Sequence, residues 1–464
     1  MSTHHHCVTA ITILLSASAH AQTCNFALAT KAFSPAASEN ENFGLDGSVS
    51  GDFAAISAGR TLSFFDTEPV YIFRRIEGQW VHDDTISMEQ PNSNAFFGAS
   101  VSLSGNRLAI SASGEDDDTH GEETGAVYLY AFDGNNWVLQ ERIIANDAAP
   151  TDRFGNYLML DGDTLIVGAD GGTTNGFNTG ALYVFEHDGF SWNQTAKLEP
   201  PNIGSGNSMW GPASRTGDII LAGDLNATNQ TGASTGAVYE FRKVNNSWTY
   251  HSKITPTVSN SGALFGQSID IDGNTTVIGA FGDNANGSFA GAAHVFELQG
   301  TDWVETHKLT PSDTNPLEGF GQSVAIEDNS IFICSEVIIS QDYGSVYLFQ
   351  NTDGTWAESD KLASPVSALT GFASRISVSD STILIPAAYD FDAGNAAGAA
   401  YFYDLHCDSP CLPDVNNDGM VTPADFSAWV AAFNAQAPEC DQNGDSTCSP
   451  ADFSAWVANF NAGC

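Results

Sequence analysis

Basic residues are scarce in this chain of 464 residues. It contains 15 lysines and arginines against 56 aspartates and glutamates, which gives a formal net charge of −41. Such a charge repels phosphate-rich partners, so it argues against nucleic acids and anionic membrane surfaces as ligands. Cation binding or salt tolerance would explain the excess acid functionally, and a solvated acidic surface is the simpler structural explanation.

Long apolar runs are also lacking after the N-terminal segment. The run Val8–Ala19 is shorter than the about 20 residues that a transmembrane helix needs. It instead fits the apolar core of a signal peptide, and Ala19-His20-Ala21 supplies a cleavage pattern. We therefore predict a signal peptide over residues 1–21, a secreted or cell-surface location and no membrane span. A retained N-terminal anchor is the alternative.

Recognisable catalytic motifs are missing as well. The sequence contains no G-x-S-x-G elbow, no H-E-x-x-H helix and no phosphate-binding glycine loop. A pair of carboxylates that cleaves glycans cannot be recognised by eye among 56 acidic residues. The sequence therefore favours a non-catalytic protein and keeps a polysaccharide-active enzyme, a glycoside hydrolase or lyase, as the alternative.

The main feature that the chain does contain is a long repeat. An aromatic residue beside a glycine recurs 52 to 57 residues apart, at Phe43-Gly44, Phe97-Gly98, Phe154-Gly155, Trp210-Gly211, Phe265-Gly266, Phe320-Gly321 and, reversed, Gly371-Phe372. Each unit contains four short segments in which apolar and polar residues alternate, joined by turns rich in glycine, aspartate and asparagine. Seven units of four strands predict an all-β fold, a seven-bladed β-propeller over residues 22–406, in preference to a two-sheet sandwich.

The seventh repeat lacks its fourth strand. Six repeats end in a strand with tryptophan, whereas the seventh stops after the segment that begins at Gly398. Four of these tryptophans are followed five residues later by lysine, and Lys31 follows Phe26 at the same spacing. The N-terminal segment is therefore predicted to complete the last blade. Aligning the blades places Cys24 beside Cys407, and a disulfide between them would close the ring.

The repeats resemble the FG-GAP repeats of integrin α subunits and of many secreted bacterial proteins, over roughly residues 24–406. Long loops between the second and third strands would then form the ligand face. Integrin-type blades often carry a calcium loop between their first two strands, but here short turns such as Ser104-Gly105-Asn106 occupy that place. Calcium is therefore not expected in the blades. The acidic run 115–118, with Glu122 and Glu123, could hold a cation or form a solvated loop.

The composition changes after Cys411, where two units repeat 27 residues apart. Each unit reads as half an EF-hand, in which loop positions 1, 3, 5, 7, 9 and 12 supply oxygen ligands to Ca²⁺. These positions hold Asp414, Asn416, Asp418, Met420 (through its carbonyl), Thr422 and Asp425 in the first loop, and Asp441, Asn443, Asp445, Thr447 (through its carbonyl), Ser449 and Asp452 in the second. About two Ca²⁺ ions are therefore predicted. The second site is expected to be weaker, because Ser446 replaces a glycine in the turn.

Each loop leads into a predicted helix with one apolar face, and the two faces can pack together. The duplicated pattern resembles dockerin modules, in particular a variant that ends in Gly-Cys, over residues 407–464. The resemblance implies attachment to a cohesin-like protein, with another envelope or extracellular component as the alternative. Dockerins usually contact cohesin through polar residues at loop positions 10 and 11, but Pro423-Ala424 and Pro450-Ala451 stand there.

The remaining cysteines lie mostly in this tail. A Cys440–Cys448 disulfide would clip the second loop and a Cys411–Cys464 disulfide would join the two ends, although other pairings remain open. Cys334 lies in an apolar run and is predicted to be buried and unpaired.

These features together predict a secreted binding, adhesion or display protein. The propeller loops would present a surface to a glycan or protein ligand, while the calcium-dependent tail would attach the molecule to a partner. A polysaccharide-active enzyme and a structural surface-layer component are the alternatives.

Overall fold

The computed structural model describes residues 23–36, 39–59, 69–88, 94–174, 177–178, 180–201, 211–228, 233–336, 343–367, 370–408, 415, 422–435, 437, 440–442 and 447–462. The chain divides into two compact units, one spanning Asn25–His406 and one that includes Cys407–Cys464. Among the described residues, no helix is both long and apolar enough to cross a bilayer. The predicted signal peptide, residues 1–21, lies outside the described part.

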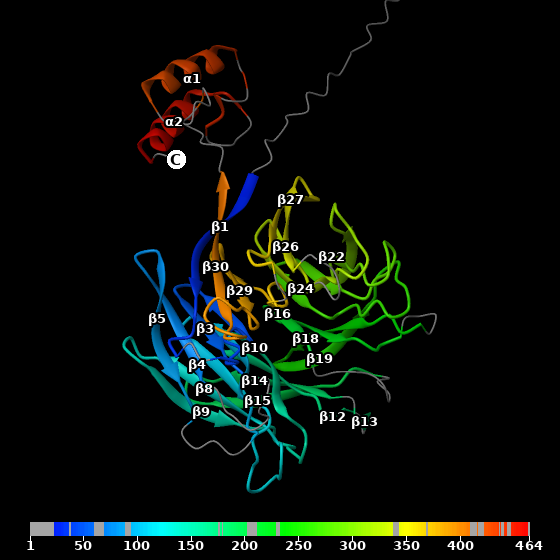
Figure 1. Ribbon diagram of the computed structural model, residues 1–464. Coiled ribbons are helices and arrows are strands. Elements are labelled where there is room, and N and C mark those ends of the chain that lie inside the picture. Colours follow the sequence, from blue (N-terminus) through cyan, green and yellow to red (C-terminus); the bar gives the residue numbers. More distant parts are fainter. Residues whose placement is uncertain are drawn as a thin grey trace, which may run out of the picture. The chain divides into compact units, whose positions relative to one another are not determined.

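Four-stranded sheets make up the larger unit, and they follow one another in sequence order around it (Figure 1). Blade 1 contains β2 (Gly47–Ser50), β3 (Phe53–Ser57), β4 (Val70–Ile76) and β5 (Gln79–Ile86). Blade 2 contains β6 (Phe97–Ser104), β7 (Arg107–Ala112), β8 (Ala126–Phe132) and β9 (Trp137–Ile143). Blade 3 contains β10 (Phe154–Asp161), β11 (Thr164–Ala169), β14 (Ala181–His187) and β15 (Trp192–Leu198), with the short pair β12 (Thr173–Thr174) and β13 (Phe177–Asn178) between its second and third strands.

The other four blades repeat this plan. Blade 4 contains β16 (Ala213–Thr216), β17 (Ile219–Asp224), β18 (Ala237–Val244) and β19 (Ser247–Ile254). Blade 5 contains β20 (Ile269–Asp272), β21 (Thr275–Ala280), β22 (Ala292–Gln299) and β23 (Asp302–Leu309). Blade 6 contains β24 (Phe320–Glu327), β25 (Ser330–Ser335), β26 (Ser345–Thr352) and β27 (Thr355–Ala363). Blade 7 contains β28 (Ser377–Ser379), β29 (Thr382–Ala387), β30 (Ala399–Asp408) and β1 (Thr23–Ala32).

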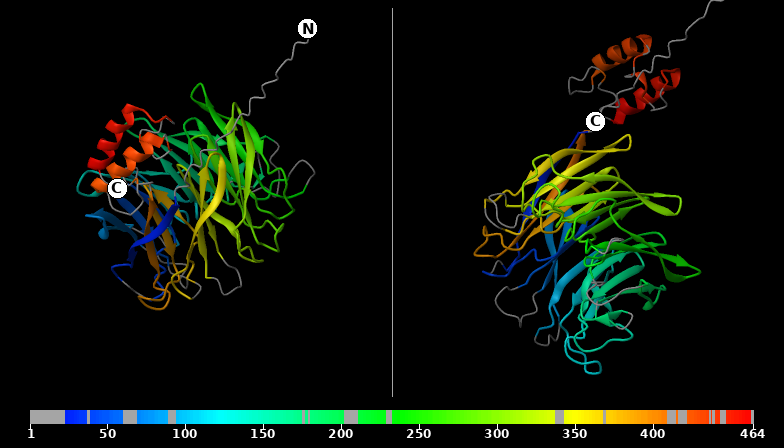
Figure 2. Two further views of the ribbon diagram at one scale, coloured as in Figure 1. Left: turned by 90° about the horizontal axis from the view of Figure 1, so that it is seen from above. Right: turned by 90° about the vertical axis from the view of Figure 1, so that its right-hand side faces the viewer.

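The first strands of the blades form the inner wall of a ring. Each first strand contacts the first strand of the next blade, and β28 of blade 7 contacts β2 of blade 1. Tight turns that connect first and second strands use Gly105, Gly162 and Gly273 at positive φ, as hairpins of this kind require. The described residues therefore form the predicted seven-bladed β-propeller, seen from two further directions in Figure 2.

The aromatic–glycine pairs of the sequence form the joints between blades. The six described aromatic rings of these pairs are all buried: Phe43, Phe97, Phe154, Phe265, Phe320 and Phe372. The fourth pair begins with Trp210, which lies outside the described residues. Except at Phe97, the backbone of these phenylalanines lies against the glycine that precedes the third strand of the preceding blade, for example Gly291 against Phe320. The pair Gly398 and Phe43 makes the same joint between blades 7 and 1.

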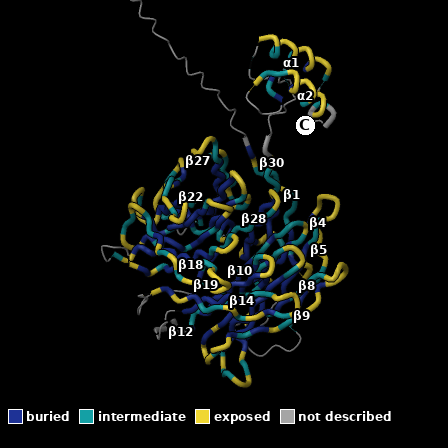
Figure 3. Tube along the Cα trace, turned by 180° about the vertical axis from the view of Figure 1, so that it is seen from behind, coloured by how far each residue is buried: buried dark blue, intermediate teal, exposed yellow. Residues whose placement is uncertain are grey.

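Apolar side chains between neighbouring sheets form the core. One cluster combines Val70 and Ile72 of blade 1 with Leu108 and Ile110 of blade 2, and comparable clusters occur between other neighbouring blades. Burying each such side chain contributes about 1.5–3 kcal/mol. Figure 3 shows that the buried residues follow the strands, while the exposed residues gather at turns and loops. The blades therefore stabilise each other, since an isolated sheet would expose these faces.

The N-terminal strand β1 is the outer strand of the seventh sheet, beside β30. Its Lys31 pairs with Asp390 at 3.0 Å and lies over the ring of Tyr401. Lys361 makes the same two kinds of contact, with Tyr347 of blade 6 and with Asp313 of the connection that precedes this blade. The strand at the start of the chain thus takes the place of a fourth strand in blade 7.

The structure tests the predictions for Cys334 and, in part, for Cys24. Cys334 is fully buried and free, as predicted. Cys24 is buried and disulfide-bonded. Its pairing with Cys407 stays a prediction, because the side chain of Cys407 lies outside the described set.

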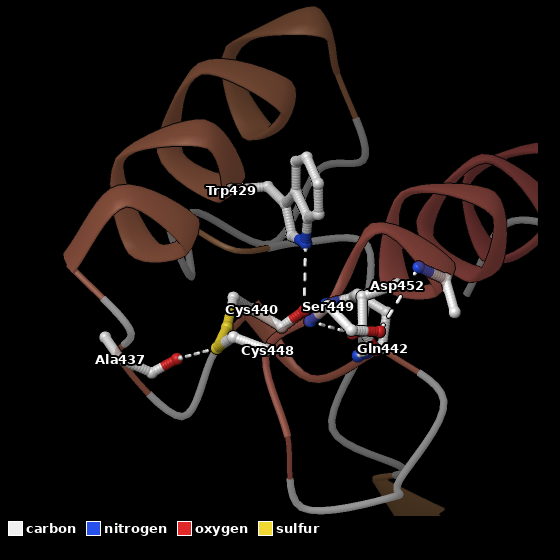
Figure 4. Close-up of a disulfide and its surroundings, with 8 residues drawn as sticks. Trp429, Ala437, Cys440, Gln442, Cys448, Ser449 and Asp452 are labelled. Atoms are coloured by element: carbon white, nitrogen blue, oxygen red, sulfur yellow. Dashed lines mark hydrogen bonds between the residues drawn. A yellow bond between two sulfur atoms is a disulfide. The ribbon is translucent and has the colours of Figure 1, made fainter.

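The smaller unit contains two helices, α1 (Pro423–Ala435) and α2 (Pro450–Ala462). Their aromatic faces pack together, with ring centroids 5.2 Å apart for Phe426 and Trp456 and 5.7 Å apart for Trp429 and Phe453. A Cys440–Cys448 disulfide lies nearby, and the indole nitrogen of Trp429 donates a hydrogen bond of 3.1 Å to the carbonyl of Cys440 (Figure 4). Two short helices thereby share one small core.

Candidate functional site

Hydrogen bonds between inner strands surround the central opening of the ring. Ser48 and Ser50 of β2 accept hydrogen bonds from the backbone amides of Leu103 and Gly105 in blade 2, at 3.0 and 2.9 Å. Serines of blades 2 and 7 and aspartates of blade 5 bond to the following blade in the same way. The inner strands have no further sheet partner, so these side chains satisfy amides that an edge strand would otherwise expose.

A cavity of about 360 Å³ lies at one end of this opening. Residues that follow the aromatic–glycine pairs of six blades line it, among them Asp46, Tyr157, Gln267, Gln322 and Arg375. The pairs place these residues at equivalent positions in each blade, so side chains far apart in sequence converge on one point. Sequence analysis did not identify this site. The available sequence signal for it was the alternation of polar and apolar residues after each aromatic–glycine pair.

Asp46 and Arg375 form an ion pair across the joint between blades 7 and 1. Arg375 Nη1 lies 3.2 Å from Asp46 Oδ1, while Asp46 Oδ2 accepts a hydrogen bond from the amide of Val101 at 3.0 Å. The carboxylate is buried, whereas more than half of the Arg375 side chain is exposed. Arg375 can therefore offer hydrogen-bond donors to a ligand in the cavity.

The hydrogen-bond partners of Asp270 are neutral groups, whereas Asp46 pairs with Arg375. Its Oδ1 accepts from Ser214 Oγ at 3.1 Å and from its neighbour's amide, and its Oδ2 accepts from the amide of Ile326 at 2.9 Å. Burial raises the pKa of Asp270 to about 6, with a smaller contribution from the charge of Asp272. Asp270 thus exchanges a proton near neutral pH while it joins blades 4, 5 and 6.

Tyr157 is buried where the charges of both Asp46 and Asp270 act on its hydroxyl. Its hydroxyl donates a 2.5 Å hydrogen bond to the carbonyl of Ala213. Burial, with smaller contributions from the charges of Asp270 and Asp46, raises the pKa of Tyr157 to about 12. The site therefore contains acceptors, a phenol and a guanidinium that suit a small polar ligand. Its carboxylates are held by amides of the chain, which favours binding and structural roles.

The acidic run 115–118 was expected either to hold a cation or to be solvated. Glu115 Oε1 accepts from Arg142 Nε at 2.9 Å, and Asp117 Oδ1 lies 2.7 Å from His120 Nδ1. The hydrogen bond with His120 lowers the pKa of Asp117. Arg142 thus pairs with both Glu115 and Asp117, and no cluster of metal-binding side chains occurs within the described ranges.

The structure describes half of the predicted calcium ligands. Thr422, Asp425, Asp441, Thr447, Ser449 and Asp452 are described. The other six lie outside the described residues: Asp414, Asn416, Asp418, Met420, Asn443 and Asp445. Cys411 and Cys464 also lie outside them, so their predicted disulfide is untested. The calcium sites remain a prediction.

Asp425 and Asp452 occupy equivalent places at the starts of the two helices. Both are fully buried. Asp425 Oδ2 accepts from the amide of Thr422 at 2.8 Å, and Asp452 Oδ2 accepts from the amide of Ser449 at 2.7 Å (Figure 4). These are capping boxes, in which the third helical residue bonds back to the residue before the helix. Each carboxylate oxygen has a second lone pair, so capping is compatible with a calcium ligand.

Comparison with known proteins bears on the propeller alone. The FG-GAP repeat model matches residues 80–130, 137–185, 248–296 and 303–349, and each match runs from the outer strand of one blade to the third strand of the next. No curated protein matches the sequence. A solved structure entitled "Structure of YjhT" is similar at 12% identity with a TM-score of 0.40, covering 71% of this chain and 99% of that chain. The chain thus carries FG-GAP repeats within a seven-bladed β-propeller.

Proposed function

We propose that this protein is a secreted, non-catalytic binding, adhesion or display protein. The observation that carries this proposal is the division of the chain into a rigid FG-GAP propeller and a separate unit with duplicated, oxygen-rich loops. The propeller presents loops to a glycan or protein ligand, as conserved scaffolds with variable loops commonly do. The second unit attaches the molecule to a cohesin-like protein or to another envelope or extracellular component.

The attachment unit binds Ca²⁺ in this proposal. Its loops would hold about two ions, with Asp425 and Asp452 as the last ligand of each loop. Support comes from the burial of both carboxylates at the helix starts and from the packing of the two helices against each other. Calcium would neutralise the acidic loops and thereby stabilise the helix pair.

Calcium titration of the full-length chain tests this proposal. We expect two binding events by calorimetry and a gain of helical circular dichroism. Asp425→Asn and Asp452→Asn should each remove one event, while Asp133→Asn, at an exposed turn of blade 2, should change neither. Binding heat that persists in the double variant, or no binding to the wild-type chain, would contradict the calcium-dependent tail.

A polysaccharide-active enzyme is the second candidate, and the raised pKa of Asp270, whose charge acts on Tyr157 as that of Asp46 does, favours it. Two carboxylates in unlike environments are the groups that glycoside cleavage uses. Incubating the full chain with polysaccharides and measuring new reducing ends tests this candidate. Cleavage that Asp270→Asn abolishes would replace the binding proposal, whereas intact polysaccharide would leave the binding proposal standing.

A further inference from the structure

A second cavity, of about 530 Å³, lies between blades 2 and 3. The loops before β6 and β10 and the loops after β7 and β11 line it. The side chains that matter are Asn94, Phe96, Glu123, Arg153 and Asp170. Its volume falls in the range of about 300–1,000 Å³ that is typical of small-molecule sites. Neither the channel cavity nor the tail uses these five side chains.

An exposed aromatic ring forms one wall of this cavity. Phe96 is 39% exposed although it stands directly before the buried Phe97. A side chain on Gly114 would overlap the Phe96 ring, so the glycine makes room for the ring and restricts its position. A fixed ring of this kind gives an apolar platform for a flat, apolar face of a ligand.

Two buried hydrogen-bond acceptors of the cavity wall have no donor among the described residues. Asn94 Oδ1 and Asp170 Oδ1 are buried, and neither accepts a hydrogen bond from any residue that the structure describes. An unsatisfied buried acceptor costs about 1–3 kcal/mol. Both oxygens are closed to solvent, so a ligand with hydroxyl groups would instead donate to the partly exposed carboxylates of Glu123 and Asp170.

The charges of the cavity select against ionic ligands. Arg153 lies 2.9 Å from Glu123 and 3.8 Å from Asp170, so one cation stands between two carboxylates. An anionic ligand would meet these carboxylates and a chain of net charge −41. A cationic ligand would meet the Arg153 guanidinium. Burial raises the pKa of Asp170, which further reduces its attraction for a cation.

We propose that this cavity binds a pyranose unit of an uncharged glycan. The C–H face of the sugar lies on the Phe96 ring, and its hydroxyls donate hydrogen bonds to the partly exposed carboxylates of Glu123 and Asp170. Arg153 offers its remaining donors to oxygens of the sugar. This inference rests on the proposed function as a binding protein, and it names the ligand class and the site.

Binding of defined oligosaccharides to the full-length chain tests the site. The probes are cellohexaose, laminarihexaose, mannohexaose and hexa-N-acetylchitohexaose, with a hexamer of galacturonate as the anionic comparison, all measured by calorimetry. Phe96→Ala removes the ring, and Asp170→Ala removes a carboxylate that accepts from the sugar. Phe289→Ala is the matched control, because Phe289 is 40% exposed at φ 50° and Phe96 is 39% exposed at φ 51°.

The proposal expects at least one neutral hexamer to bind. Phe96→Ala and Asp170→Ala should each weaken that binding at least tenfold, and Phe289→Ala should leave it unchanged, with melting temperatures confirming that all variants fold. Equal binding by all variants would place the glycan elsewhere and overturn this site, while the binding function would stand. Preference for the galacturonate hexamer, or no binding of any neutral hexamer, would overturn the ligand class. The calcium titration tests the attachment proposal independently of either result.

Discussion

A glycine before the third strand of most blades lets two blades approach closely, and Gly398 is the instance that joins the last blade to the first. It adopts φ +85°, and an added Cβ would collide with the carbonyl of Phe43. We predict that Gly398→Ala lowers the free energy of unfolding by about 3 kcal/mol or more, since steric overlap adds to the cost of about 1–2 kcal/mol for an L-residue in this region. Urea denaturation measures the loss.

Gly78 provides the control for this substitution. It adopts φ +77° with open space around it. Gly78→Ala should therefore lower the free energy of unfolding only by the cost of placing alanine at positive φ, about 1–2 kcal/mol. Equal losses in the two variants would show that backbone strain, and not the contact between blades, determines the effect.

Asp270 makes the stability of the ring depend on pH. Its folded-state pKa of about 6 exceeds the value of about 3.9 for an unfolded aspartate, so the folded chain binds more protons between these pH values. Ionised Asp270 therefore opposes folding above pH 6. We predict that Asp270→Asn raises the free energy of unfolding by at most about 3 kcal/mol at pH 7.5, and that the gain disappears as the pH falls below about 4.

Denaturation curves at several pH values test this effect, with Asp83→Asn as the control at an exposed position of β5. If the gain in the free energy of unfolding is the same at pH 4 and pH 7.5, the substitution acts through packing and not by removing the ionisation of Asp270.

Some residues at the blade joints were predictable and others were not. The buried phenylalanines stand out in the sequence because a glycine stands beside each one. The residues just before them also share a feature, since Asn42, Phe96, Arg153 and Leu264 all adopt positive φ. No common residue type marks these positions, so the sequence alone does not reveal them. Phe96 and Arg153 of the second cavity belong to this group.

At the scale of the strand, β1 makes the last blade depend on the start of the chain. Lys31 pairs with Asp390, whose side chain is fully buried, whereas Lys361 pairs with Asp313, whose side chain is 48% exposed. We predict that Lys31→Met lowers the free energy of unfolding by about 2–3 kcal/mol, because it leaves a buried carboxylate without its cation. Lys361→Met should cost less than about 1 kcal/mol.

Chemical denaturation of the two variants measures this difference. Equal losses would indicate that the stacking of each lysine on its tyrosine ring, which both blades share, is the main contribution. Such a result would reduce the stabilising role assigned to the Asp390 ion pair.

The elements could be predicted from the sequence more completely than their contacts. Alternating apolar residues and glycine turns locate the strands, because each blade must bury both faces of its sheet against its neighbours. The spacing of Phe426, Trp429 and Phe433 likewise predicts one face of α1. The sites could not be predicted in this way, since the channel unites six blades and the second cavity takes Phe96 from one blade and Asp170 from the next. Contacts between repeats depend on the ring, which no single repeat encodes.

At the scale of the whole molecule, the net charge of −41 opposes the compact state. The basic residues are few, and Lys31, Lys197, Lys308 and Lys361 are already paired with aspartates. Most of the acidic surface therefore repels itself without compensation. Added salt screens this repulsion, because the Debye length falls from about 30 Å at 0.01 M to about 10 Å at 0.1 M.

We predict that raising NaCl from 10 to 200 mM, with a chelator present to exclude Ca²⁺, raises the melting temperature by about 2–5 °C. Screening should be nearly complete by 200 mM, so the rise should level off there, whereas a general salting-out effect would continue to rise in proportion to concentration up to 1 M. Thermal scans across this range separate the two causes. A melting temperature that falls with salt would show that the internal ion pairs outweigh the repulsion, since screening weakens attraction and repulsion alike.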